Sequence, residues 1–177
     1  MKLTTVFPVA LSLLLLSAAA LADKTAGESV DDSTTQAAVK AKLVGDDFFG
    51  GMSINIETHK GIVQLGGWID DADAGAKAAE LAAGVDGVKS VDNQLHVKRG
   101  KASMGQTVDD TVITTRVKAA QAESEQCSSM SINVDTYNGV VLLTGFADSA
   151  EVKAACGELT AKVANVQDFI NGIYVAD

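Results

Sequence analysis

An internal repeat constrains this chain more than any other feature of its sequence. A shift of 78 residues superimposes 30–97 on 108–175 without a gap, and 25 of the 68 aligned pairs are identical. The blocks 52–55 and 130–133 both read Met-Ser-Ile-Asn, and the same alternation of glycine, valine and leucine follows at 61–67 and 139–145. The repeat therefore predicts two tandem copies of one small domain.

Each copy is expected to contain three strands, because apolar residues alternate with period two over short runs. These runs are Met52–Thr58, Ile62–Trp68 and Ser90–Val97, with Asp168–Val175 as the last strand of the second copy. Asn138-Gly139 suits a two-residue hairpin turn, whereas in Lys60-Gly61 only the glycine suits one equally well. Gly87 and Asn165 occupy the same position before the last strand, so left-handed backbone is expected at both.

Two helices per copy are expected from their N-terminal signals and from apolar spacing. The first begins at Ser29 or Thr107 and the second at Asp70 or Asp148, each with an acid three residues later as in a capping box. Helical spacing then places a buried stripe on the second helix. The stripe consists of Ala74, Ala78, Leu81 and Val85, matched by Val152, Cys156, Leu159 and Val163.

This element order places both helices of a copy on one face of a three-stranded sheet. Because a helix connects the second strand to the third, these two strands are expected to be parallel, which makes the sheet mixed. The expected fold class is α+β, with two tandem αββαβ two-layer domains at 29–97 and 107–175. A polar, glycine-bearing linker at 98–106 joins them, and an arm at 23–28 precedes the first.

The first 22 residues have the layout of a secretory signal peptide. Lys2 gives a positive start, Val6–Leu16 is almost entirely apolar, and Ala20-Leu21-Ala22 offers a cleavage site. A membrane anchor is the alternative, but the apolar run is short and no basic stop-transfer cluster follows it. No cysteine stands at the cleavage site to carry a lipid anchor. We expect an exported, soluble protein with no transmembrane helix after cleavage.

Composition argues against several classes of function. The 14 Lys and Arg against 23 Asp and Glu give a net charge of −9, which opposes nucleic-acid binding. The two His and two Cys show no spacing typical of a metal site, and no motif pairs a nucleophile with a base. We therefore expect a protein that is not an enzyme and has no metal, no cofactor and no nucleic-acid partner.

The G-x-V-x-L-x-G strand, the alanine-rich helix after it and the last strand with Asn93 or Asn171 resemble the BON-domain family. The second copy departs from the family pattern at Asn165, where glycine is usual. The resemblance implies a non-catalytic periplasmic protein of the osmotic or envelope stress response. It implies exported or outer-membrane proteins as partners, bound in chaperone-like fashion through apolar segments, or alternatively phospholipid. The acidic surface weakens the phospholipid alternative, because anionic headgroups would repel it.

The sheet face turned away from the helices is the predicted contact surface. Val63 and Leu65 point to the core, as does Gly67, which would let a helix approach closely. The opposite face carries two aromatic pairs and two aliphatic positions. These candidate binding residues are Ile62, Trp68, His96, Leu142, Phe146 and Tyr174. The alternative is that the two domains cover each other with these faces, or that the aromatic residues only pack across strands.

Cys127 and Cys156 stand in the second copy where the first copy has Phe49 and Ala78. Phe49 follows the first helix and Ala78 lies on the buried stripe, so the two positions are expected to touch. In an oxidising compartment a disulfide would replace that apolar contact. Buried free thiols are the alternative, and a redox-active pair is disfavoured because no C-x-x-C is present.

The remaining charged features have structural explanations. Asp31-Asp32, Asp46-Asp47 and Asp70-Asp71 lack the glycine and glutamate of a calcium loop, so they are assigned to capping and solvation. His59 lies beside the hairpin turn, with Tyr137 in its place in the second copy, and is expected to be exposed. Lys98-Arg99-x-Lys101 is a basic island that could touch headgroups, but we assign it to the linker.

Overall fold

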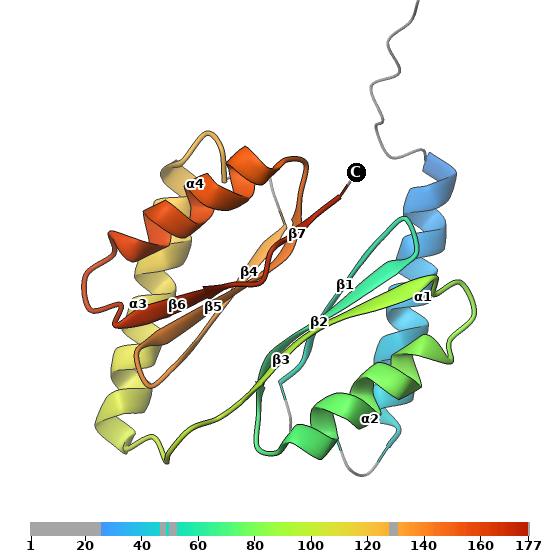
Figure 1. Cartoon of the computed structure of the whole chain (residues 1–177), viewed down its shortest axis with the longest axis horizontal. Helices are drawn as coiled ribbons and strands as arrows, with labels where there is room; N and C mark the ends of the chain where they lie inside the picture. The colour runs from blue at the N-terminus through green and yellow to red at the C-terminus, as the bar shows by residue number, and fades with distance from the viewer. Residues whose placement is uncertain (1–25, 47–48, 50–52, 128–130, 177) are drawn as a thin grey trace, which may run out of the picture.

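The computed structural model describes residues 26–46, 49, 53–127 and 131–176, which form two units of matching topology (Figure 1). The first unit consists of α1 (Ala26–Val44), β1 (Asn55–His59), β2 (Ile62–Ile69), α2 (Ala72–Ala83) and β3 (Ser90–Val97). The second consists of α3 (Met104–Glu123), β4 (Ile132–Tyr137), β5 (Val140–Ala147), α4 (Ala150–Ala161), β6 (Asp168–Asn171) and β7 (Tyr174–Val175). The expected signal peptide lies outside the described residues. Within them, no helix combines the length and apolarity needed to cross a membrane.

Each unit has a mixed sheet, with the hairpin strands antiparallel and the strand after the crossover helix parallel to its neighbour. The order in the first sheet is β1-β2-β3, and the second sheet repeats it with β4, β5 and β6. Each unit also has its own hydrophobic core. Val63 and Leu65 belong to the first core and Val141 and Leu143 to the second. The α+β fold of two αββαβ units, predicted from the repeat, is confirmed.

The buried stripe of the second helix follows the prediction closely. Ala74 and Ala78 are buried in the first core, and Leu81 and Val85 pack against it. In the second unit Cys156 is buried, and Val152 and Val163 pack on the core. Leu159 is only half-buried.

The last strand of the second unit is divided, where one continuous strand was expected. β6 ends at Asn171 and β7 begins at Tyr174. Between them, the carbonyl of Gly172 accepts a hydrogen bond from Gln64 Nε2 of the first unit at 2.8 Å. A Cβ on this glycine would lie 2.8 Å from Gln94 Oε1. The strand is interrupted because side chains of the first unit approach the backbone closely at this glycine.

The helices do not begin where the capping signals suggested. α1 and α3 start three residues early, and the capping box of α3 joins Ser103 to Gln106. The Gln106 backbone N–H donates to the Ser103 hydroxyl at 3.2 Å, and the Gln106 side chain accepts from the Ser103 N–H at 2.8 Å. α2 and α4 begin after the N-cap residues Asp71 and Ser149, one position later than expected. Several capping residues stand in each segment, and only the path of the chain selects one of them.

The aspartates that were read as capping acids hold the hairpin turns instead. Asp32 accepts hydrogen bonds from the backbone N–H groups of Lys60 and Gly61, both at 2.8 Å. Asp110 accepts in the same way from Asn138 at 2.9 Å and from Gly139 at 2.7 Å. Both carboxylates are buried. The first helix of each unit is thereby tied to its hairpin.

The same contact explains why lysine is tolerated in the first turn. Lys60 has a φ of 51° and Asn138 a φ of 50°, so both hairpins adopt the left-handed geometry that only Asn138 suits intrinsically. The carboxylate of Asp32 on the turn N–H groups offsets the conformational cost at Lys60. Gly87 and Asn165 also have positive φ values, 91° and 73°, which confirms the expectation for both loops.

Asp110→Asn should lower the free energy of unfolding by about 2 kcal/mol, because the amide can accept from one turn N–H only and presents its own NH₂ to the other. Urea denaturation of the purified protein measures this difference. Asp109→Asn is the matched control, since Asp109 is an exposed neighbour on the same helix. Equal midpoints for the two variants would contradict a role for Asp110 in holding the turn.

Gly67 was expected to let a helix approach closely, but neither Gly67 nor its equivalent Gly145 serves that purpose. Both have positive φ values, 139° and 121°, which disfavour any residue with a side chain. A Cβ on Gly67 would lie 2.7 Å from the carbonyl oxygen of Ser53, in the segment that leads into β1. The repeated glycine therefore serves a close approach of backbone to backbone within the sheet.

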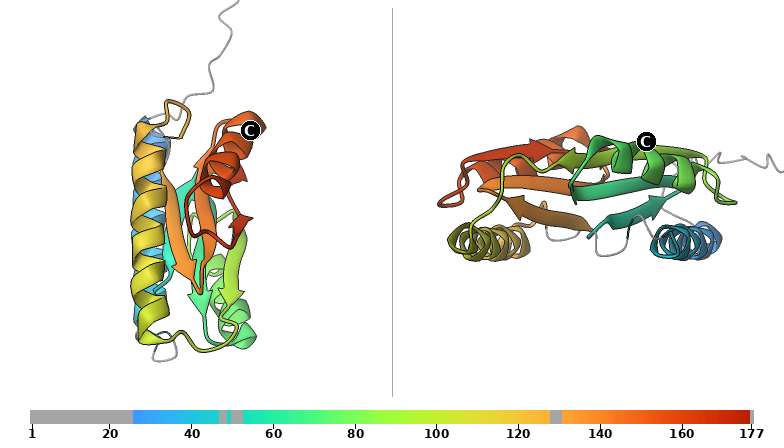
Figure 2. Two further views of the ribbon diagram at one scale, coloured as in Figure 1. Left: turned by 90° about the vertical axis from the view of Figure 1, so that its left-hand side faces the viewer. Right: turned by 90° about the horizontal axis from the view of Figure 1, so that it is seen from below.

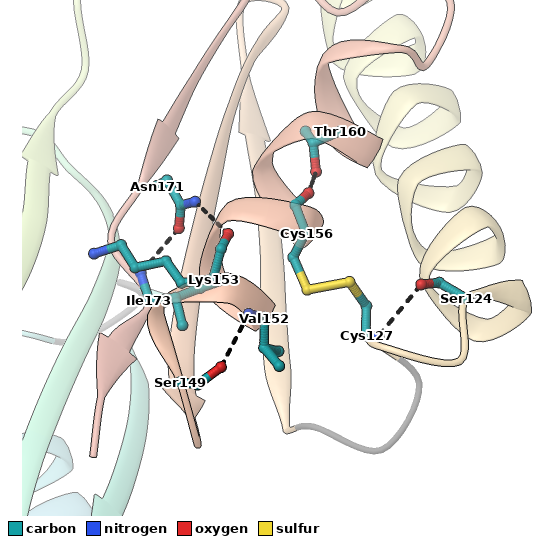
Figure 3. The surroundings of a disulfide bond; sticks show 9 residues. All are labelled: Ser124, Cys127, Ser149, Val152, Lys153, Cys156, Thr160, Asn171 and Ile173. Carbon is teal, nitrogen blue, oxygen red and sulfur yellow. Dashed lines mark hydrogen bonds between the residues drawn. A yellow bond between two sulfur atoms is a disulfide. The ribbon is translucent and has the colours of Figure 1, made fainter. Parts of the chain in front are cut away.

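Cys127 and Cys156 form the predicted disulfide, with their Cα atoms 5.8 Å apart. The bond joins the segment after α3 to the buried side of α4 (Figure 3). Ser124 Oγ accepts a hydrogen bond from the Cys127 backbone N–H at 3.3 Å and shapes the turn into the bond. In the first unit Phe49 and Ala78 belong to one buried cluster, as the repeat predicted.

The two units pack with the helix-free faces of their sheets together. In Figure 1 the helices α1 and α2 lie on one outer side, α3 and α4 lie on the other, and both sheets are between them. A half turn about the viewing direction exchanges the two units. Figure 2 shows α1 and α3 on the same side of the sheets, at opposite ends of the molecule. The sequence repeat is therefore arranged as an approximate two-fold pair.

Candidate binding site at the domain junction

Polar pairs related by the approximate two-fold join the sheets. Asn55 Nδ2 donates to the Asp135 carboxylate, and the equivalent Asn133 Nδ2 donates to Glu57 Oε1 at 3.0 Å. Burial raises the pKa of Asp135, opposed by the charge of Lys118 and by the hydrogen bond from Asn55. The interface thus holds partly buried carboxylates that are paired with amides.

The centre of the interface is closely packed. A Cβ on Gly66 would lie 2.7 Å from both Cγ2 and Oγ1 of Thr144, its equivalent in the other unit. Gln64 is fully buried beside this pair. Its Nε2 donates to Asp92 Oδ2 at 2.7 Å and to the Gly172 carbonyl, and its Oε1 accepts from the Gly145 N–H. The amide of Gln64 therefore satisfies groups from both sheets.

The six residues predicted as a contact surface lie on the faces that meet here. Leu142 is completely buried, outside the second core, while Ile62 is half-buried. The other four form the expected neighbouring pairs: ring centroids are 5.9 Å apart for Trp68 and His96, and 5.6 Å for Phe146 and Tyr174. The domains cover each other over the centre of this surface, which was the stated alternative. The aromatic residues remain half-buried at its two ends.

Each aromatic pair is completed by a ring from the other domain. Trp68 lies 5.7 Å from Tyr137, and Phe146 lies 5.3 Å from His59, between ring centroids. The expectation of an exposed His59 was wrong, because the hairpin tip reaches across the junction and half-buries the ring. These two clusters are equivalent under the two-fold, since His59 and Tyr137 occupy the same place in the repeat.

A groove of about 490 Å³ opens at the Trp68 end of the junction. Both domains and the connection between them form its wall. Its lining residues are Trp68, Leu95, His96, Val97, Arg99, Tyr137, Asn138, Val140, Asp168 and Ile170. Val97 is 39% exposed and contributes to this wall. The groove therefore combines aromatic and aliphatic surface with one cation and one carboxylate.

The linker is held against the groove by the second domain. The Tyr137 hydroxyl donates to the Gly100 carbonyl at 2.6 Å, and Asn138 Nδ2 donates to the Arg99 carbonyl at 3.1 Å. Burial lowers the pKa of His96, which favours the uncharged form of its ring. The permanent positive charge beside the groove therefore belongs to Arg99.

Three polar atoms of the groove residues lack partners. Trp68 Nε1, His96 Nε2 and Asn138 Oδ1 are shielded from water and make no hydrogen bond with any residue that the structure describes. The orientation of the Asn138 amide is fixed, because its nitrogen must face the Arg99 carbonyl. Unpaired buried groups of this kind are rare and costly, and an ordered water or a bound ligand can supply the missing partner.

Asn93 connects β3 to α2 next to the groove. Asn93 Nδ2 donates to the Gly75 carbonyl of α2 at 3.0 Å, and its Oδ1 accepts from the Leu95 N–H at 3.1 Å. Asn171 repeats both contacts in the second domain, with Lys153 and Ile173 (Figure 3). The repeated asparagine thus ties the last strand of each sheet to the helix that precedes it.

The described members of the acidic pairs make structural contacts. Asp46 pairs with Lys77 at 2.8 Å and Asp70 with Lys98 at 3.0 Å, whereas Asp71 caps α2. Asp47 lies outside the described residues. In the part of the chain with described placement, no cluster of His, Cys, Asp and Glu could hold a metal ion.

Sequence reasoning did not identify Tyr137, Asn138 and Arg99 as parts of one site. Tyr137 and Asn138 were assigned to a hairpin turn and Arg99 to a linker, and nothing in their spacing brings them together. One signal was available: both copies carry an aromatic ring immediately before the turn, His59 or Tyr137. A repeated aromatic residue at a hairpin tip indicates a buried role for it.

Comparison with known proteins identifies related sequences and a similar solved structure. Over 124 aligned residues the chain is 36% identical to the osmotically-inducible protein Y of Escherichia coli. The aligned segment covers 70% of this chain and 62% of that relative. It is 29% identical to the outer membrane lipoprotein DolP of Haemophilus influenzae over 83% of this chain and 76% of that one. The solved structure of the C-terminal domain of CdsD, from the type III secretion system of Chlamydia trachomatis, aligns with 82% of this chain and with 67% of its own chain. The two share 15% sequence identity, and the TM-score is 0.33.

The family model of the BON domain matches the chain twice, over residues 31–99 and 109–177. These two matches coincide with the two αββαβ units and with the 78-residue repeat. This chain therefore belongs to the BON-domain family and carries one BON domain in each repeat.

Proposed function

We propose that this protein is a non-catalytic binding protein of the bacterial periplasm that shields apolar segments of exported proteins during osmotic or envelope stress. The observation that carries the proposal is the groove at the domain junction. It offers Trp68, Tyr137 and Val97 as apolar surface, and a volume of about 490 Å³ accommodates a few side chains rather than a folded partner.

The cell envelope as the place of action is supported by the disulfide and by the relatives. A buried disulfide that ties a loop to a helix is typical of proteins that fold in an oxidising compartment. Two relatives carry names that refer to osmotic induction and to the outer membrane. Both features agree with the signal-peptide layout of residues 1–22.

A second candidate function, contact with phospholipid, rests on a different surface. Met104, Val108 and Val112 are spaced four apart on α3 and are 87%, 60% and 39% exposed. Such a stripe on one face of a helix can insert shallowly into a lipid headgroup region. The name of the lipoprotein relative also refers to a membrane. The net charge of −9 opposes this candidate when the headgroups are anionic.

Two matched substitutions separate these candidates. Val97→Ser alters the groove and Val108→Ser alters the α3 stripe, and both positions are exposed, so neither change should affect folding strongly. Suppression of the aggregation of heat-treated citrate synthase reports the capture of apolar segments. We expect Val97→Ser to weaken suppression about fivefold, from the loss of about 1 kcal/mol of apolar contact, and Val108→Ser to leave it unchanged.

Binding to phospholipid vesicles is measured on the same proteins. Loss of vesicle binding in Val108→Ser, together with full aggregation suppression by Val97→Ser, would favour the membrane function and overturn the proposal. Trp68→Ala is less suitable as the primary variant, because Trp68 packs against Tyr137 across the junction and its truncation also disturbs the domain contact.

A further inference from the structure

We propose that the groove recognises the free C-terminal end of a peptide whose last residue is apolar, with Arg99 as the partner of the terminal carboxylate. This inference rests on the proposed function in that it names the chemical class of segment bound at the same groove. It assigns Arg99 as the residue that determines specificity. Nothing in the repeat pattern or in the cores requires an arginine at this position.

The charge at the groove points to an anionic ligand. Arg99 lines the groove, and no carboxylate of the described residues lies within ion-pair distance of its guanidinium. The preceding Lys98 is already paired with Asp70 at 3.0 Å. A free guanidinium beside an apolar groove, in a protein of net charge −9, is complementary to a carboxylate attached to an apolar group.

Side chains of the second domain hold the backbone at Arg99 in place. Asn138 and Tyr137 hold the backbone carbonyls of Arg99 and Gly100 at 3.1 and 2.6 Å, and both side chains are themselves part of the groove wall. The cation is therefore attached to a backbone segment that is fixed against the second domain. Preorganisation of this kind reduces the entropy lost when a ligand binds.

The hydrogen-bonding groups of the groove favour a peptide over a lipid. Asn138 Oδ1 has no partner among the described residues, and Asn138 lines the groove, so the site presents a buried acceptor that needs an N–H donor. A terminal peptide residue brings a carboxylate for Arg99 and a backbone N–H for such an acceptor. A fatty acid brings the negative charge without the donor, and a phospholipid carries its donors on the headgroup, away from the apolar acyl chains, whereas a peptide carries its N–H on the same residue as its apolar side chain. Because Asn138 Oδ1 is shielded, the groove side chains must shift for a ligand to reach it.

The two-fold equivalent end of the junction provides an internal comparison. The 78-residue offset that aligns Trp68 with Phe146 and His96 with Tyr174 places Asp177 at the position of Arg99. The repeat thus preserves aromatic residues at both ends but puts a cation in only one of the two aligned positions. A role in ligand selection accounts for this difference, whereas a role in the shared fold does not.

The test compares one peptide in two chemical forms. An N-terminally fluorescein-labelled hexapeptide, Gly-Ser-Gly-Ser-Leu-Phe, is prepared with a free carboxylate and with a C-terminal amide, and binding to the full protein is followed by anisotropy. We expect the acid to bind about tenfold more tightly than the amide. Arg99→Gln should remove this preference, so that the acid and the amide bind with similar affinity. Arg116→Gln, an exposed arginine of α3, should retain it.

The outcomes separate this inference from the proposed function. Equal binding of acid and amide, or a preference that survives in Arg99→Gln, would overturn the carboxylate assignment while leaving capture of apolar segments in place. Displacement of the labelled acid by decanoate or by phosphatidylglycerol vesicles, at concentrations as low as those of the unlabelled peptide, would overturn the peptide assignment in favour of a lipid. Binding of neither peptide, together with wild-type aggregation suppression by Val97→Ser, would overturn both.

Discussion

Removal of the disulfide should lower the free energy of unfolding of the second domain by about 3 kcal/mol. Cys127 and Cys156 are 29 residues apart in the sequence, and a cross-link over a loop of this length restricts the unfolded chain by about that amount. Cys127→Ala/Cys156→Ala loses the cross-link and also leaves a space in the second core, since both cysteines are buried there. Thermal unfolding with and without reductant measures the effect for the unmodified protein.

The first domain supplies the matched control for this experiment. It fills the equivalent positions with Phe49 and Ala78, which are buried in the first core. Cys127→Phe/Cys156→Ala places the residues of the first domain at these positions of the second. This variant should be more stable than the double alanine variant, because the phenylalanine ring restores apolar contact. Identical melting temperatures for the oxidised and reduced protein, or two alkylatable thiols in the unreduced protein, would contradict a structural disulfide.

Gly66→Thr should destabilise the protein by about 3 kcal/mol and separate the two domains. A Cβ at Gly66 would lie 2.7 Å from Thr144 side-chain atoms, in the closely packed centre of the interface, and threonine adds two further heavy atoms. The backbone of Gly66 does not have a positive φ, so strain in the strand itself does not contribute. Thermal unfolding reports the loss of stability, and small-angle scattering reports an increase in the radius of gyration.

Exchange of the two residues should reverse this effect. Because Gly66 and Thr144 are equivalent under the two-fold, Gly66→Thr/Thr144→Gly recreates the same pair in the opposite order and should recover most of the stability. Gly75→Ala is the control: its Cβ would lie 3.1 Å from Ile69 Cδ1 in the first core, so Thr144→Gly should not rescue it. A Gly66→Thr variant that is as compact and stable as the original protein would show that the sheets do not meet here in solution.

The local features of each domain could be predicted because they depend on neighbours in the sequence. Alternation located β2 and β5, helical spacing located the buried side of α2, and turn residues located both hairpins. The repeat did more than any single motif, since aligning Cys127 and Cys156 with Phe49 and Ala78 indicated which side chains meet. Errors occurred at the helix starts, where several candidate caps stand in one segment and tertiary packing selects among them.

The candidate site could be predicted only in part, because it depends on how the domains pack. Trp68 and His96 were identified from the pattern of one sheet face. Tyr137 and Arg99 were not, since they come from the second domain and from the linker. A single aspartate illustrates the same limit: Asp110 has the sequence context of a helix cap, but it holds a hairpin 28 residues further along the chain.

The amino-acid sequence by itself determined the number of domains and their αββαβ order, and it predicted that the two cysteines meet, because periodicity, turn residues and a repeat encode short-range geometry. Only the tertiary structure decided that the helix-free sheet faces cover each other, and that a groove remains where Trp68, Tyr137 and Arg99 meet. Those outcomes depend on the shapes of two surfaces that fit at Gly66 and Thr144, and such complementarity across more than seventy residues leaves no periodic signal in the chain.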